Sequence, residues 1–138
     1  MTTKLITKSD FKKIYKFWQE AGLHLYPDDE EQQRFDDMID LNPDLCFSFL
    51  TEDNKIIGTI LGGFDGRTAT INRLAISPDQ QGNGLGKALI KKLEEKLQKR
   101  GIKKIAIMIH VKNTQVIPFY EKLGFKEMDY VKMYYKDF

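Results

Sequence analysis

The chain has 138 residues, 41% of them hydrophobic, which suits one domain with a substantial core. Its 22 basic and 20 acidic residues are interleaved and leave a net charge of only +2, which argues against a nucleic-acid-binding protein. No apolar run approaches the roughly 20 residues of a membrane span, and the N-terminal residues lack the apolar core of a signal peptide. We therefore expect a single domain over residues 1–138, cytoplasmic, with no nucleic-acid or membrane partner.

The first part of the chain predicts one short strand and two helices. Residues 4–7 form the strand, and the first helix begins at Ser9 or Asp10. Its apolar residues recur at i, i+3, i+4 and i+7: Phe11, Ile14, Tyr15 and Trp18. After Pro27, Asp28 and Glu31 form a plausible capping box for the second helix. That helix carries one apolar side and ends at an Asn-Pro pair: Phe35, Met38, Ile39, then Asn42 and Pro43.

Three strands follow at residues 47–51, 56–64 and 68–77, and their short connections predict an antiparallel meander. The next helix carries one leucine stripe and stops at a glycine: Leu85, Leu89, Leu93, Leu97 and Gly101. The remaining chain predicts a strand at 104–111, a helix at 114–123 and a final strand or hairpin at 125–138. This order predicts a three-layer α/β fold with a central mixed β-sheet flanked by helices on both faces.

The most informative segment is residues 73–87, where an apolar strand runs through a glycine-rich turn into a helix. Glycines 82, 84 and 86 leave backbone N–H groups open to an anion at the helix N-terminus. The spacing does not fit G-x-G-x-x-G, because the third glycine comes one residue too early. It does not fit a P-loop either, because Gln81 replaces the first glycine and Ala88 the magnesium-binding hydroxyl. The turn therefore predicts a phosphate site of another kind.

Two motifs together resemble the GNAT superfamily of acyl-CoA-dependent N-acyltransferases. The turn, residues 81–86, is similar to the family signature [QR]-x-x-G-x-[GA]. Asn113 and Tyr120 fit the second hallmark, N-x6-Y-E-x-L-G-F, which ends at Phe125. The two motifs occur in family order, with a strand-helix-strand stretch between them. The resemblance implies an N-acetyltransferase that moves an acetyl group from acetyl-CoA to a primary amine by direct transfer.

In that family the glycine turn holds the pyrophosphate of coenzyme A, and the preceding strand pairs with the pantetheine arm through its backbone. The resemblance implies these cofactor-binding residues: Leu74, Ala75, Ile76, Gln81, Gly82, Asn83, Gly84, Leu85, Gly86, Lys87, Asn113, Phe119 and Tyr120. The strand residues also suit a plain core strand. Both roles are compatible, because the backbone can bind a ligand while alternate side chains pack.

The resemblance makes Tyr120 the general acid for the departing thiolate. A phenol of reference pKa about 10 can protonate a thiolate whose conjugate acid lies near 8.5. Tyr120 could instead be an aromatic packed beside Phe119 and Phe125. Asn113 either caps the following helix or, as the resemblance implies, contacts the pantetheine amide or a water.

The general base is open, because Thr70 stands where some family members carry a glutamate. Deprotonating an amine of pKa about 10.4 costs about 4.6 kcal/mol at pH 7, so some group or water chain must assist. Asp65 and His110 are the candidates, although Asp65 suits a turn and His110 suits an ordinary strand end. Our leading hypothesis is a deprotonation relayed by water with no single base.

The acceptor site is expected near residues 20–36, one wall of that site in the family. The candidate substrate-binding residues are His24, Tyr26, Arg34 and Arg73. Trp18 fits the core better, and the acidic residues 28–31 could attract a cationic amine or simply be solvated. A small molecule or a peptide could supply the amine.

Two rival classes stay open: an acyl-CoA sensor of the same fold without turnover, and a phosphate-binding interaction domain with a coincidental glycine turn. We expect a monomer or a homodimer, the latter pairing through the last strand. We expect no metal. The single cysteine, Cys46, lies in an apolar run and suits a buried small hydrophobe.

Overall fold

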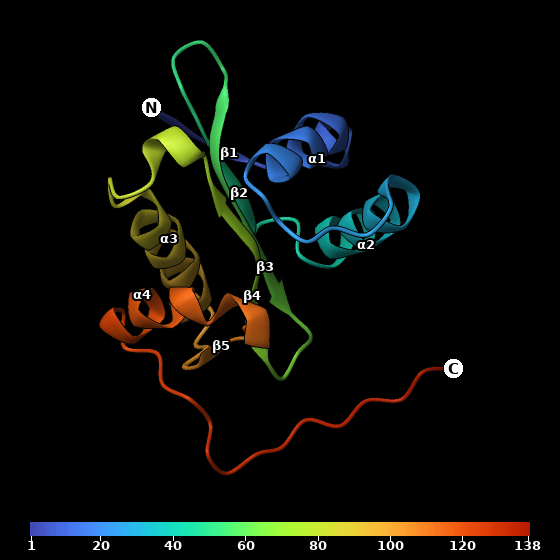
Figure 1. The fold of residues 1–138 in the computed structure, drawn as a ribbon, viewed down its shortest axis with the longest axis vertical. Helices are drawn as coiled ribbons and strands as arrows, with labels where there is room; N and C mark the ends of the chain where they lie inside the picture. Colours follow the sequence, from blue (N-terminus) through green and yellow to red (C-terminus); the bar gives the residue numbers. More distant parts are fainter. The chain divides into compact units, whose positions relative to one another are not determined.

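A computed structural model describes residues 1–138 as two compact units, residues 1–107 and 108–138. The first unit contains a five-stranded sheet in the order β1-β2-β3-β4-β5 (Figure 1). Strands β1 to β4 pair antiparallel, as the predicted meander requires, and β5 pairs parallel with β4, which makes the sheet mixed. The strand bounds are β1 Thr2–Leu5, β2 Cys46–Leu50, β3 Ile56–Phe64, β4 Ala69–Ile76 and β5 Ile105–Ile107.

Helices cover both faces of this sheet, which confirms the predicted layers. They are η1 Lys8–Asp10, α1 Phe11–Glu20, α2 Asp28–Leu41, η2 Pro78–Gln80 and α3 Leu85–Lys99. Two adjacent glycines in β3 show the arrangement, because neighbouring strand residues face opposite sides. A Cβ added at Gly62 would collide with Cδ1 of Leu93 in α3, and one at Gly63 would lie 3.2 Å from Cε of Met38 in α2. Figure 1 likewise draws α1 and α2 on one side of the sheet and α3 on the other.

The amphipathic stripes predicted for α1 and α3 are the faces that pack on the sheet. Trp18 of α1 is fully buried and meets Phe35 of α2 edge to face, with ring centroids 6.1 Å apart. On the other face the α3 stripe is buried at Leu89, Leu93 and Leu97. Burying each such leucine stabilises the fold by about 1.5–3 kcal/mol. None of the helices is both long enough and apolar enough to span a bilayer.

Cys46 is buried at the start of β2, as the sequence predicts. Its Sγ lies 3.6 Å from the carbonyl of Gly62, and burial raises the pKa of the thiol to about 12. A thiol that stays protonated is a poor nucleophile, so Cys46 contributes packing and not chemistry.

The capping box predicted for α2 is wrong. Pro27 is the N-cap residue and no side chain caps the helix. The carboxylate of Asp28 accepts the N–H of Asp29 instead. Glu31 is buried, with 3% of its surface exposed, because its side chain turns inward from the first turn of α2. Its partners belong to the site described below.

The second unit contains η3 Val111–Val116 and α4 Ile117–Lys122. Two predicted elements are shorter than expected: the strand at 104–111 reduces to β5, and the helix at 114–123 begins as a 3-10 turn and becomes α-helical only at Ile117. Pro118 lies in the first turn of α4, where its missing N–H costs nothing.

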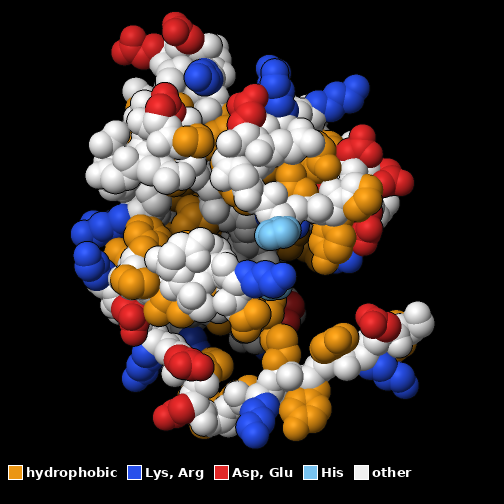
Figure 2. Space-filling model, viewed as in Figure 1, with side chains coloured by type: hydrophobic (Ala, Val, Ile, Leu, Met, Phe, Trp, Pro, Cys, Tyr) orange, Lys and Arg blue, Asp and Glu red, His pale blue; other side chains and the backbone are white.

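The predicted final strand at 125–138 is wrong, because no helix or strand forms there. Tyr134 and Tyr135 are 86% and 88% exposed, and Figure 2 shows hydrophobic side chains along the C-terminal segment. β-branched and aromatic residues favour strands only where a neighbouring edge supplies hydrogen bonds and packing, and this segment pairs with no strand. Elsewhere on the face in Figure 2, basic and acidic side chains are dispersed, in keeping with the small net charge.

Candidate active site

The strand before the glycine turn is irregular at one point. Thr59 of β3 pairs with Ala75, but Leu61 pairs with Asn72, so Arg73 and Leu74 together stand opposite a single residue of β3. This is a β-bulge, and Arg73 adopts a left-handed backbone with φ of 50°. A non-glycine residue in that conformation costs about 1–2 kcal/mol, so the surrounding structure must hold it there.

Beyond the bulge, one edge of β4 has no strand partner. The parallel pairing with β5 covers only Ala69, Thr70 and Ile71. From Asn72 to Ile76 the main-chain groups on that side therefore lie outside any ladder. An unpaired strand edge offers alternating N–H donors and C=O acceptors to an extended ligand. The sequence-predicted residues Leu74, Ala75 and Ile76 all lie on this edge.

The glycine turn joins this edge to the N-terminus of α3. Gly82 and Gly84 have φ of 84° and 78°, which glycine adopts without strain. A Cβ at either position would meet nothing within 4 Å, so the turn is open on that side. Gly84 is the N-cap of α3, no side chain caps the helix, and the first helical bond runs from the Ala88 N–H to the Gly84 carbonyl. The preceding N–H groups are free to donate to an anion, which fits a pyrophosphate.

Side chains of the turn hold it against the end of β4. The amide of Gln81 donates to the carbonyl of Ile76 at 3.4 Å, and the amide of Asn83 donates to the side chain of Gln80 at 3.4 Å. The exposed Lys87 lies in the first turn of α3, where its cation suits a phosphate. An open strand edge, a glycine turn and an uncapped helix therefore lie consecutively in the chain.

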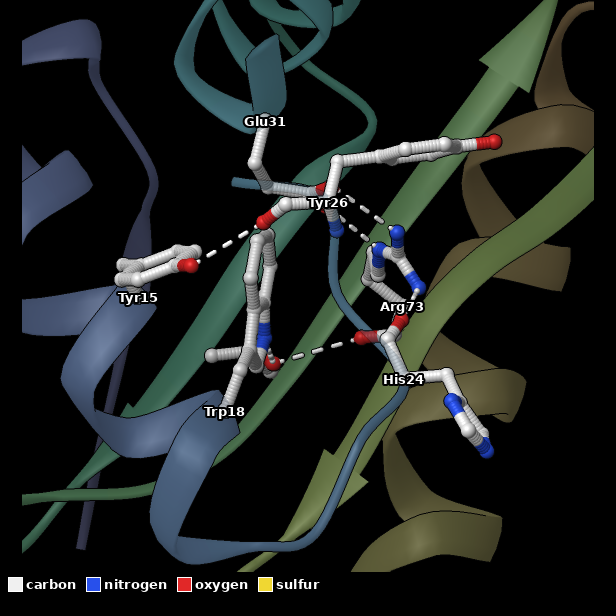
Figure 3. Close-up of polar contacts among 7 residues, drawn as sticks. Tyr15, Trp18, His24, Tyr26, Glu31 and Arg73 are labelled. Carbon is white, nitrogen blue, oxygen red and sulfur yellow. Dashed lines mark hydrogen bonds and ion pairs between the residues drawn. The ribbon is translucent and has the colours of Figure 1, made fainter. Parts of the chain in front are cut away.

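A partly buried ion pair is formed by the bulge residue Arg73 (Figure 3). The Arg73 guanidinium donates from Nε to Oε1 of Glu31 at 2.7 Å and from Nη2 to Oε2 at 3.1 Å. Its Nη1 donates to the carbonyl of His24 at 2.9 Å. The side chain of Glu31 is 4% exposed and that of Arg73 is 26% exposed. Glu31 also accepts the N–H of Tyr26 at 3.3 Å, so both carboxylate oxygens are used.

A second chain of hydrogen bonds reaches the main chain of the same residue. Nε1 of Trp18 donates to the hydroxyl of Thr59 at 2.9 Å, and that hydroxyl donates to the carbonyl of Arg73 at 3.3 Å. The Trp18 ring also lies 5.8 Å from the guanidinium carbon of Arg73. The bulge is thus tied to α1, to α2 and to the loop between them.

The predicted acceptor residues come together on this side of the sheet. The guanidinium carbon of Arg34 lies 4.1 Å from the centre of the Tyr26 ring, which is a cation–π contact, and the Tyr15 hydroxyl donates to the Tyr26 carbonyl at 3.0 Å. In Figure 3 the His24 imidazole turns away from the Arg73 guanidinium, while the His24 carbonyl faces it. The 21–27 loop is therefore held by its main chain and presents the rings of His24 and Tyr26 outward.

Sequence reasoning missed Glu31 and Thr59 at this site. Its acidic neighbours favour a capping or solvated role for Glu31, yet it precedes Phe35 and Met38 by one and two helical turns and so falls on the apolar side of α2. An acidic residue on a buried stripe needs a cationic partner, and that signal was available. The partner itself, Arg73, lies 42 residues away and could not be identified from spacing.

In the second unit, the two predicted residues His110 and Asn113 are neighbours. His110 caps η3, with its Nδ1 accepting the N–H of Lys112 at 3.1 Å. Its carbonyl accepts the N–H of Asn113 at 2.8 Å. Asn113 lies inside η3 with non-helical angles, and its Oδ1 accepts the Gln115 amide at 2.6 Å. The capping role considered for Asn113 therefore belongs to His110.

Tyr120 lies in α4 and is 7% exposed. Its ring meets Phe119 and Phe125 edge to face, with centroids 5.0 and 5.5 Å apart. Burial raises the pKa of the phenol to about 12, because the apolar surroundings disfavour the phenolate. The group thus keeps its proton across the working pH range. The aromatic packing and an acid role are compatible, since the packing fixes the ring.

The candidate base Asp65 and the nearby Thr70 are both already hydrogen-bonded within the protein. The carboxylate of Asp65 accepts the N–H groups of Arg67 at 2.8 Å and Thr68 at 2.7 Å, which confirms it as a turn former. These bonds lower the pKa of Asp65 and make it a weak base. The hydroxyl of Thr70 accepts the amide of Asn72 at 2.9 Å, so that position holds a neutral polar pair.

Comparison with known proteins identifies the class that has this fold and site. Residues 11–125 match the acetyltransferase (GNAT) family model. An acetyltransferase of Pectobacterium atrosepticum is 32% identical over 133 residues, 96% of this chain and 93% of that protein. An acetyltransferase of Sodalis glossinidius is 33% identical over 131 residues, 95% and 91% of the two chains.

Solved structures agree. The ribosomal-protein-S18-alanine N-acetyltransferase of Escherichia coli gives a TM-score of 0.75 at 26% identity, covering 92% of this chain and 78% of that one. The PaiA N-acetyltransferase of Thermoplasma acidophilum, solved with coenzyme A, gives 0.78 at 20% identity over 94% and 92%, a likeness of fold alone.

The chain belongs to the GNAT acetyltransferase family. It is an acyltransferase of the N-acetyltransferase type.

Proposed function

We propose that this enzyme transfers the acetyl group of acetyl-CoA directly to a primary amine, with residues 1–138 acting as one GNAT domain. The observation that carries the proposal is the β4 bulge, whose free edge runs through an open glycine turn into the uncapped N-terminus of α3. The family match at residues 11–125 includes sequence from both compact units, which supports treating them as one catalytic domain.

Different groups of the chain bind different parts of the donor. The main chain of Leu74, Ala75 and Ile76 pairs with the pantetheine arm, and an N–H of this strand donates to the oxyanion that develops on the thioester carbonyl. The N–H groups of the glycine turn and the ammonium of Lys87 hold the pyrophosphate. In the second unit, Asn113 and Phe119 contribute further contacts to the cofactor.

Tyr120 supplies the proton to the departing thiolate. With a phenol pKa of about 12 and a thiol pKa near 8.5, full transfer is uphill by about 5 kcal/mol, more than an exposed tyrosine would require. A hydrogen bond from the phenol stabilises the forming thiolate as soon as charge develops, before the proton is transferred in full.

Water relays the proton from the attacking amine, with no single residue as base. The turn bonds of Asp65 weaken it as a base, and Nδ1 of His110 already accepts a backbone N–H, which leaves Nε2 as the site that carries the proton in the neutral ring. His110 can still orient a water in such a relay.

The acceptor is a primary amine of a small molecule or a peptide that reaches His24, Tyr26 and Arg34. The Escherichia coli relative is named for acting on an alanine of a ribosomal protein, which makes peptide N-termini a sensible first set to screen. The enzyme acts as a monomer or a homodimer.

Titration calorimetry with acetyl-CoA, desulfo-CoA and ATP tests the donor site. Binding of both CoA forms at micromolar concentration, with none of ATP, supports the proposal. A panel of amines assayed for thiol release then tests turnover. Binding of CoA with no release across the panel would favour the sensor reading instead, and no binding of CoA would overturn the proposal.

A further inference from the structure

We infer that Glu31 is a positioning residue for the donor site, because it holds Arg73 in the left-handed conformation that creates the β4 bulge. The inference rests on the proposed function of β4 as the strand that binds the pantetheine arm. Glu31 meets that strand through the guanidinium of Arg73. It acts through Arg73, whose side chain and main-chain carbonyl are both hydrogen-bonded to neighbouring elements.

The left-handed backbone at Arg73 is what needs support. Among the non-glycine residues only Asn54 and Arg73 have positive φ, and Asn54 lies in a turn between strands, where asparagine is well tolerated. Arg73 is neither glycine nor asparagine and lies inside a strand. Without added constraints, the chain would relax toward regular β geometry and remove the bulge.

The constraints converge on this one residue from three elements. Glu31 of α2 accepts two guanidinium hydrogen bonds, the His24 carbonyl accepts the third, and Thr59 of β3 donates to the Arg73 carbonyl. The Glu31 side chain is only 4% exposed, so water cannot replace Arg73 as the partner of its carboxylate. The folded state therefore requires this ion pair. Three of the five guanidinium N–H groups already donate to protein oxygens, so the main role that the structure supports for Arg73 is to hold its own backbone and the acceptor loop.

The consequence is a link between the two sides of the proposed site. The same guanidinium holds the His24 main chain in the acceptor loop and sets the β4 backbone next to Leu74. A change at Glu31 should therefore affect the affinity for the donor, although Glu31 lies among the acceptor-side residues.

A comparison of glycine with alanine at position 73 separates this role from simple packing. Both variants are made with Glu31→Gln, so that no carboxylate is left buried without its partner. Glycine adopts a positive φ without strain, whereas alanine does not. We expect Glu31→Gln/Arg73→Gly to bind desulfo-CoA within about threefold of the wild type and Glu31→Gln/Arg73→Ala to bind about five- to thirtyfold more weakly.

The single variant Glu31→Gln provides a second readout if a double variant folds poorly. The glutamine amide places an N–H group where the guanidinium of Arg73 needs a hydrogen-bond acceptor. We therefore expect KM for acetyl-CoA to rise several-fold while kcat changes little. Glu30→Gln is the matched control, because Glu30 is the neighbouring glutamate and its ion pair with Arg34 is exposed. It should leave the affinity for desulfo-CoA unchanged.

Equal loss of affinity in the glycine and alanine variants, with wild-type binding intact, would overturn the positioning role and leave the proposed function standing. So would an unchanged KM for acetyl-CoA in Glu31→Gln. Failure of the wild-type chain to bind desulfo-CoA would overturn the proposed function, and the positioning role with it.

Discussion

The two units hold their proposed functional residues in different ways. In residues 1–107 the key contacts join distant parts of the chain: Trp18 to Thr59 across 41 residues and Glu31 to Arg73 across 42. In residues 108–138 they are local: His110 to Lys112 and Asn113 to Gln115 each span two residues. Tyr120 is likewise packed by its near neighbours.

This difference separates binding from chemistry. The edge of β4 that we propose binds the donor exists only when the whole first unit is folded, so damage to its supports should reduce stability and affinity together. The groups around Tyr120 depend on one short helix and its flanks. Removal of the Tyr120 hydroxyl alone should therefore slow the chemistry and change donor binding little. The predictions below test that separation.

The largest expected effect is on turnover. Tyr120→Phe keeps the edge-to-face packing but removes the proton, so we expect kcat to fall about 10²- to 10⁴-fold. The affinity for desulfo-CoA, measured by calorimetry, should stay within about threefold. A kcat within tenfold of the wild type would remove Tyr120 from the general-acid role.

The next effect is on stability in the first unit. Glu31→Ala leaves a guanidinium that is only 26% exposed without its partner, and we expect the free energy of unfolding to fall by about 2–3 kcal/mol. The matched control is Asp44→Ala, which removes an exposed pair with Arg100 and should cost less than about 1 kcal/mol. Urea unfolding followed by circular dichroism measures both. Equal costs would mean that the long-range pair is no more important than a surface one.

The sequence predicted the local parts of this molecule well. The glycine turn, the α3 stripe and the Asn113–Tyr120 spacing could be recognised because each lies within one short segment of the sequence. The fold class followed from the order of such segments, and the structure and the comparisons confirm it.

The parts that failed depend on partners far away in the chain. Glu31 looked like a helix cap because its sequence neighbours are acidic, and only the folded sheet brings Arg73 to it. The last strand was predicted from its tyrosines and valine, but strand formation needs an edge that local sequence does not specify. The bulge at Arg73 carries no glycine or asparagine, so nothing in the sequence marked its positive φ.

A glycine comparison sharpens the account of the turn. Gly84 and Gly101 lie at opposite ends of α3, with φ of 78° and 79° and open space around both. Alanine at either position should cost about 1–2 kcal/mol of stability through backbone strain. Only Gly84→Ala should also weaken desulfo-CoA binding, by about tenfold, because its amide lies in the proposed anion site. Similar loss of affinity in both variants would mean that helix stability, and not the turn geometry, controls binding.

The smallest predicted effect is an alkaline loss of stability that comes from Tyr120 alone. The pKa of its phenol is about 12 in the folded chain and about 10 when unfolded, so between these values the folded state binds more protons. Stability is therefore complete below about pH 10 and falls as pH rises toward 12, by about 1.4 kcal/mol at pH 11. Tyr120→Phe lacks this titration, so its unfolding free energy should fall less than that of the wild type between pH 8 and pH 11. Equal losses in urea unfolding at the two pH values would show that the phenol is not desolvated. In that case Tyr120 would be held less tightly than its local aromatic contacts imply. The contrast between the local contacts that hold Tyr120 and the long-range contacts that hold β4 would then weaken.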